Sequence, residues 1–78
     1  MSMATLNDLG KTYYEELKRN PSELNIFNIA TRINGLVWKG TAQKLETQDK
    51  MIIINSIFKE APTELQAIRS KLEKSVGI

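Results

Sequence analysis

The sequence predicts an all-α protein, and three observations predict it. Apolar residues recur at helical spacing, start and stop signals separate the periodic stretches, and the one short apolar run that could form a strand has no partner. We expect a small four-helix bundle, or a three-helix core plus one added helix, formed by residues 6–19, 22–39, 48–60 and 63–76. The 78 residues are expected to form a single helical domain (1–78), with residues 1–4 as a flexible N-terminal tail.

The first helix is predicted over residues 6–19. Thr5 is its expected N-cap, and Asp8 in the first turn suits the positive end of a helix. Gly10 lowers its helix propensity by about 1 kcal/mol relative to alanine. The pair Asn20-Pro21 ends it. Its apolar residues form one narrow stripe of Leu6, Leu9, Tyr13 and Leu17.

The second helix, over residues 22–39, has the clearest amphipathic pattern. Asn20 as N-cap and Pro21 in the first turn predict its start, and Gly40 is a natural left-handed stop. Gly35 inside the helix could bend it or end it. The apolar face contains Ile26, Ile29, Ala30, Ile33, Leu36 and Val37.

The segment 41–48 is compatible with a short helix capped by Thr41 or with a loop anchored by Leu45. The third helix follows over residues 48–60, with Thr47 as the expected N-cap. Its apolar residues cover a wide arc, as in a central or interface helix. They are Met51, Ile53, Ile54, Ile57 and Phe58.

Pro62 ends the third helix, because the residue before a proline disfavours helical geometry. Thr63 and Gln66 match a capping box for the fourth helix, over residues 63–76, which Gly77 stops. Its apolar residues again form a narrow stripe of Leu65, Ile68, Leu72 and Val76.

Composition argues against most enzyme classes. The chain has no cysteine and no histidine, so thiolate catalysis, cysteine zinc sites and the commonest general base are excluded. Glu15 and Glu16 point about 100° apart on a helix, and no glycine-rich phosphate loop occurs. We therefore expect a non-enzymatic protein with no catalytic residues, cofactor, metal site or small-molecule substrate.

The net charge of +2 is mild and evenly spread, and the residue pattern contains no signal-peptide or membrane-spanning segment. A cytoplasmic protein without membrane binding is the expectation. The abundance of Asn, Ile and Lys is typical of AT-rich genomes such as those of many bacteria and their phages.

Residues 29–45 resemble a helix-turn-helix of the kind found in TetR-type repressors. Ile29-Ala30 would lie in the supporting helix and Asn34-Gly35 in the turn. The resemblance implies that Lys39, Thr41, Gln43 and Lys44 would face DNA. One continuous helix over residues 22–39 explains the same residues with better periodicity, so DNA binding is the alternative hypothesis.

The leading hypothesis is a small regulatory or accessory protein that acts by binding another protein. Phe27, Thr31, Asn34 and Trp38 would form a line along the edge of the predicted 22–39 helix. Partly exposed Phe and Trp residues are favoured anchors of protein interfaces. Arg32 and Lys39 are the charged residues expected beside this line. The broad apolar faces of the second and third helices also make a homodimer plausible.

Overall fold

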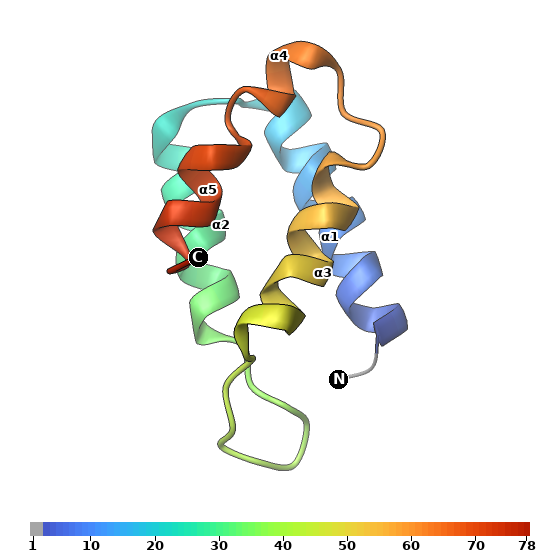
Figure 1. The fold of residues 1–78 in the computed structure, drawn as a ribbon, viewed down its shortest axis with the longest axis vertical. Helices are drawn as coiled ribbons and strands as arrows, with labels where there is room; N and C mark the ends of the chain where they lie inside the picture. Colours follow the sequence, from blue (N-terminus) through green and yellow to red (C-terminus); the bar gives the residue numbers. More distant parts are fainter. Residues whose placement is uncertain (1–2) are drawn as a thin grey trace.

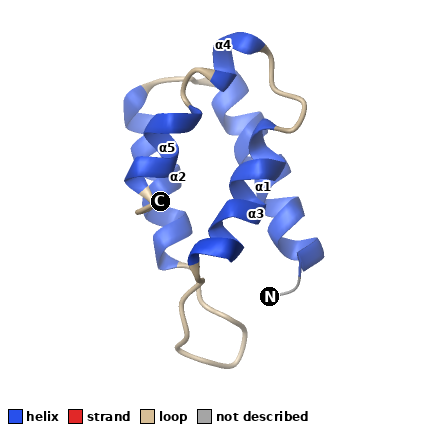
Figure 2. Cartoon of the chain, in the orientation of Figure 1, coloured by secondary structure: helices blue, strands red, loops and turns tan. Residues whose placement is uncertain are grey.

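The computed structural model describes residues 3–78 and confirms the all-α prediction. Figure 2 shows helices joined by loops, and no strand is assigned in the described range. The nearest approach to a strand pair is an isolated antiparallel bridge between Val37 and Lys44. The helices are α1 (Met3–Arg19), α2 (Glu23–Gly35), α3 (Thr47–Phe58), α4 (Thr63–Gln66) and α5 (Arg69–Ser75).

The longer helices are arranged as two packed pairs. In Figure 1, α3 lies against α1 and α5 lies against α2, while the short α4 closes one end. The loop between α2 and α3 projects from the opposite end. The described chain measures 37 × 21 × 19 Å. This arrangement leaves the outer surface of α2 without a helix packed on it.

A single apolar core joins the two pairs. The isoleucines of α3 are central to it, because Ile53, Ile54 and Ile57 are almost completely buried. Each fully buried side chain of this size contributes about 1.5–3 kcal/mol through the hydrophobic effect. Phe58, the last residue of α3, also belongs to the core. The other helices, the loop and the residue after α5 supply the rest: Leu6, Tyr13, Leu17, Ile26, Ile29, Ala30, Ile33, Leu45, Leu72 and Val76.

Gly10 allows α1 and α3 to approach closely. A Cβ atom at this position would lie only 2.3 Å from the Cβ of Ser56 and 2.8 Å from the carbonyl oxygen of Ile53. The Ser56 hydroxyl then donates a hydrogen bond of 2.8 Å to the carbonyl of Asn7 on α1. Gly10 lowers the helix propensity of α1, but it allows close packing that offsets this cost. No local sequence pattern indicates this packing role.

The prediction of an unbroken helix over residues 22–39 is wrong, because α2 ends at Gly35. Leu36 adopts an extended conformation, with φ −69° and ψ 141°. From there the side chains alternate: Leu36 and Trp38 pack against the core, whereas Val37 and Lys39 are exposed. A short apolar run can satisfy a strand-like period of two as well as the helical period, which explains the error.

Most of the segment 41–48 belongs to a loop over residues 36–46. The loop alternative is therefore the correct one, and the buried side chain of Leu45 anchors the loop as that alternative predicted. Gly40 has a φ of +80°, in the turn where the Thr41 N–H donates to the Trp38 carbonyl at 3.0 Å. The Trp38 N–H donates to the Gln43 carbonyl at 2.9 Å. Gly40 thus provides the predicted left-handed conformation, but at the tip of a hairpin-like loop and not at a helix end.

The predicted fourth helix over residues 63–76 is divided into α4 and α5. The division falls at Ala67 and Ile68, where the Ile68 N–H donates to the carbonyl of Leu65, three residues back. The tighter turn redirects the chain, so that α4 covers one end of the bundle while α5 packs on α2. Gly77, with a φ of +89°, follows the end of α5 as predicted.

Several predicted N-caps are also wrong. Thr5 lies inside α1, and Ser22 caps α2 in place of Asn20 by accepting a 3.2 Å hydrogen bond from the Asn25 N–H. Glu46 precedes α3 in place of Thr47, and Pro62 precedes α4 in place of Thr63. Gln66 instead donates through its side chain to the Phe58 carbonyl at 2.7 Å. Residues 3 and 4 of the predicted tail belong to α1, and residues 1–2 lie outside the described range.

Gly10→Ala should lower the free energy of unfolding by about 1–3 kcal/mol, because the added methyl group overpacks the contact between α1 and α3. Gly35→Ala is the matched control, since a Cβ there meets nothing within 4 Å and α2 gains helix propensity. Urea unfolding of both variants measures the difference. Equal stability of the two variants would contradict a close α1–α3 contact.

Candidate protein-binding surface

Two large apolar side chains project from the outer surface of α2. Leu24 is 71% exposed and Phe27 is 63% exposed. They are three residues apart and therefore share one face of the helix. Ile26, Ile29 and Ile33 face the core on the other side, so the core does not require the exposed pair. We refer to Leu24 and Phe27 together as the α2 patch.

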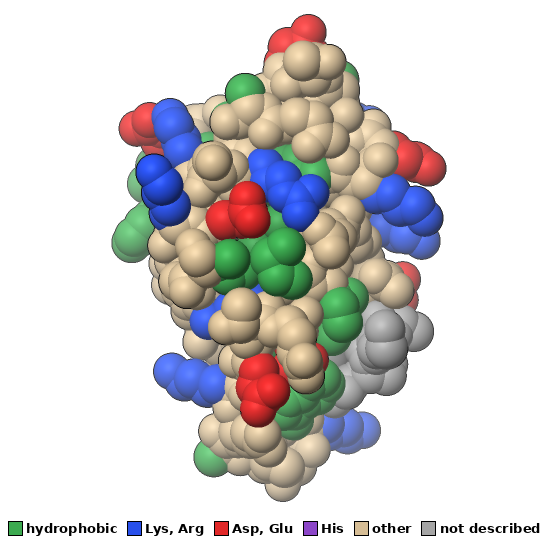
Figure 3. Space-filling model, in the orientation of Figure 1, with side chains coloured by type: hydrophobic (Ala, Val, Ile, Leu, Met, Phe, Trp, Pro, Cys, Tyr) green, Lys and Arg blue, Asp and Glu red, His purple; other side chains and the backbone are tan. Residues whose placement is uncertain are grey.

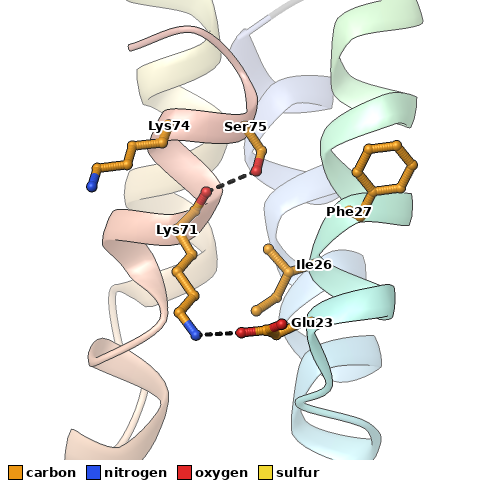
Figure 4. A pocket seen from close by; sticks show the side chains of 6 residues that line it. All are labelled: Glu23, Ile26, Phe27, Lys71, Lys74 and Ser75. Carbon is orange, nitrogen blue, oxygen red and sulfur yellow. Dashed lines mark hydrogen bonds and ion pairs between the residues drawn. The ribbon is translucent and has the colours of Figure 1, made fainter.

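Beside the α2 patch, a groove runs between α2 and α5. Figure 4 shows Ile26 pointing between the two helices and forming the apolar floor of the groove. The groove has a volume of about 330 Å³. Glu23 and Phe27 line it from α2, and α5 contributes Lys71, Lys74 and Ser75.

An ion pair crosses one end of this groove. The Lys71 ammonium lies 2.7 Å from a carboxylate oxygen of Glu23 (Figure 4). The hydrogen bond from Lys71 lowers the pKa of Glu23 below its ordinary value. Both side chains are largely exposed, so the pair is screened by water and is easily exchanged for other partners.

The structure does not bring the predicted partner-binding residues together on one surface. Phe27 and Thr31 lie one turn apart on α2 and are both exposed. Thr31 donates through its hydroxyl to the Phe27 carbonyl at 3.0 Å. The end of α2 at Gly35 removes Trp38 and Lys39 from this line and places them in the following loop.

Arg32 points toward α1 and is held there by a bidentate ion pair. Its guanidinium donates to the two carboxylate oxygens of Glu16 at 3.0 Å and 2.6 Å, and it also lies over the ring of Tyr13. The hydrogen bonds from Arg32 are the main reason why the pKa of Glu16 is lowered. Arg32 thus ties α2 to α1 and is not available beside the α2 patch.

Asn34 also makes contacts within the bundle. Its side-chain amide donates to the Ser75 carbonyl at 3.2 Å and accepts from the Lys50 ammonium at 3.1 Å. Lys50 additionally donates to the Val76 carbonyl at 3.0 Å. These contacts join the C-terminal ends of α2 and α5 to the first turn of α3. Nothing in the local sequence around Lys50 predicted this role.

The residues assigned to DNA contact in the alternative hypothesis lie in the projecting loop. Lys39, Thr41, Gln43 and Lys44 are all exposed, but they belong to residues 36–46 and not to a helix. Thr41 accepts from the Gln43 N–H and donates to the Trp38 carbonyl, which stabilises the loop. The recognition helix of the predicted helix-turn-helix is therefore absent, because the chain after Gly35 is extended.

Charged side chains of both signs are interspersed on the face drawn in Figure 3, and no large area has one sign. Among the described residues, no group of three or more acidic, histidine or cysteine side chains could hold a metal ion. None of the described helices has both the length and the apolar character needed to cross a membrane.

Known protein families, curated proteins and solved structures offer no significant match to this chain. Functional arguments therefore rest on the surface itself. The sequence pattern indicated Phe27 but not Leu24, which is the more exposed member of the patch. The spacing of Leu24 in the sequence could have indicated its exposure. Leu24 lies one turn before Phe27 and outside the stripe of buried isoleucines.

Glu16→Gln should destabilise the protein at pH 7 by about 0.5–1 kcal/mol, because it breaks the pair with Arg32. The pKa of Glu16 is lower in the folded state, so the pair stabilises the protein above the ordinary glutamate pKa of about 4.3. Its contribution is lost as the pH falls through the folded-state pKa.

The difference in melting temperature between wild type and Glu16→Gln should therefore be smaller at pH 3 than at pH 7. Glu15→Gln serves as the control, because Glu15 forms only an exposed contact of 3.6 Å with Lys18. A difference for Glu16→Gln that does not change between the two pH values would show that the ion pair is not its cause.

Trp38→Ala should lower the free energy of unfolding by about 2 kcal/mol, because the half-buried indole packs against the core. Phe27→Ala should change it by less than about 0.5 kcal/mol, since that ring is mostly exposed. Thermal unfolding followed by circular dichroism compares the two. If Trp38→Ala is as stable as wild type, the indole does not contribute to the core, and Trp38 is again a candidate interface residue.

Proposed function

We propose that this protein is a small non-enzymatic accessory or regulatory protein that binds a protein partner through the α2 patch. The observation that carries the proposal is the exposure of Leu24 and Phe27 side by side on a helix whose other apolar residues are buried. Large apolar side chains are costly to leave in water, and their clustering marks sites of association.

Burial of the α2 patch would supply part of the free energy of binding to a partner. Burying most of a leucine or phenylalanine side chain contributes roughly 1–2 kcal/mol. Phe27 is an aromatic residue that lines a groove, and aromatic residues beside pockets are favoured interface anchors. The fold also supports the patch, because Ser22 caps α2 directly before it and the Arg32–Glu16 pair ties the helix to α1.

Replacing Leu24 and Phe27 together with serine should abolish capture of the partner while leaving the fold intact. The test is affinity capture with tagged protein from a lysate of the source cells, read out by mass spectrometry. Val37→Ser is the matched control, because Val37 is also an exposed apolar residue, 40% accessible, but lies in the loop.

A protein captured by wild type and by Val37→Ser, but not by the double variant, would support the proposal. Capture that is unaffected by the double variant would contradict it. Circular dichroism of each variant excludes loss of folding as the cause, since neither substituted residue in the double variant belongs to the core.

A further inference from the structure

The groove between α2 and α5 combines an apolar floor with basic residues on one wall. Ile26 is only 3% exposed and forms the floor, and Phe27 extends the apolar surface along α2. Lys71 and Lys74 are three residues apart on α5, and both line the groove. A molecule that binds in this groove therefore needs apolar side chains that contact the floor. It also needs polar side chains on the side that faces α5.

The charges that line the groove favour a binding partner with acidic side chains on the side that faces α5. Two lysines and one glutamate line the groove, which leaves an excess of one positive charge. Glu23 and Lys71 neutralise each other. Lys74 also lines the groove, and its side chain extends across α5 on the side away from α2 (Figure 4). Within the part of the chain that the structure describes, its ammonium has no hydrogen-bond or ion-pair partner.

We propose that this groove binds one amphipathic helix of the partner, with apolar side chains over Ile26 and Phe27 and acidic side chains facing Lys74 and Lys71. This inference rests on the proposed function and specifies its partner. Binding of an amphipathic helix in a hydrophobic groove is an established mode of peptide recognition. The apolar residues of the bound helix that contact the groove recur at helical spacing. The exposed Glu23–Lys71 pair yields readily to a carboxylate of the incoming helix.

A second copy of this chain suits the groove less well. A symmetric contact places the same surface on both sides of the interface. Centred on this groove, it would set the excess positive charge of one copy against the same excess in the other. Stable dimers also bury about 800 Å² on each partner, which the two side chains of the α2 patch do not supply.

Two synthetic helical peptides of about 18 residues, roughly five turns, test the proposal. Both carry the same leucine and phenylalanine residues at positions i, i+3, i+4 and i+7, and their flanking positions hold glutamate in one peptide and lysine in the other. Fluorescence anisotropy measures affinity for the full chain, and amide chemical shifts locate the peptide. The glutamate peptide should bind and shift the amides of Ile26, Phe27 and Ser75, and the lysine peptide should bind at least about tenfold more weakly.

Lys74→Glu should weaken binding of the glutamate peptide by about fivefold or more, and Lys74→Gln should weaken it less. Lys59→Glu is the matched control, because it changes the net charge equally but lies at the end of α3 beside Lys11, away from the groove. This control should leave the affinity unchanged within about twofold.

Three results would overturn the proposal. They are failure of the glutamate peptide to bind, equal binding of the two peptides, and sedimentation that shows a dimer of the chain disrupted by Phe27→Ala. A partner whose capture requires Leu24 and Phe27 but tolerates Lys74→Glu would also overturn it, while the proposed function would stand.

Discussion

Close packing of α3 against α1 is the constraint on which the rest of the structure depends. The missing side chain of Gly10 lets the two helices meet at Ser56 and the Ile53 carbonyl. That approach brings the isoleucines of α3 into a core shared by all the longer helices. A chain of 78 residues without cysteine has no covalent crosslink to compensate for a looser core. A looser contact between α1 and α3 would therefore weaken the whole core.

Polar contacts from the last turn of α2 reinforce the apolar core that joins the two pairs of helices. The Arg32–Glu16 ion pair and the ring of Tyr13 fix α2 against α1. In the same last turn of α2, Asn34 and its partner Lys50 join α2, α3 and the chain at the end of α5 through carbonyl groups. Because the core uses only the inner face of α2, its outer face and the groove beside α5 are free to contact another molecule. The proposed binding surface thus follows from how the helices are packed.

Much of the fold could be predicted from local patterns. The buried stripes of Leu6, Tyr13 and Leu17, and of Ile26, Ile29 and Ile33, agree with the sequence-based assignment of core faces. Breaks at Pro21 and Pro62 were also predictable, because proline restricts the backbone wherever it occurs. The candidate site was predicted less well. Phe27 was found by its position on the helix edge, whereas Leu24, Lys71 and Lys74 became neighbours of one groove only through the packing of α5 on α2.

The sequence by itself determined that the protein is helical and indicated most of the buried side chains, because apolar periodicity is a local property of the chain. The tertiary structure alone decided where α2 ends. Leu36 and Trp38 reach the core from an extended backbone, and side-chain contacts of Asn34 with α3 and α5 hold that end in place. Those contacts join residues far apart in the chain, so no window of local sequence contains them. For the same reason the loop displaced the predicted recognition helix, and the exposed surface of α2 became the candidate binding site.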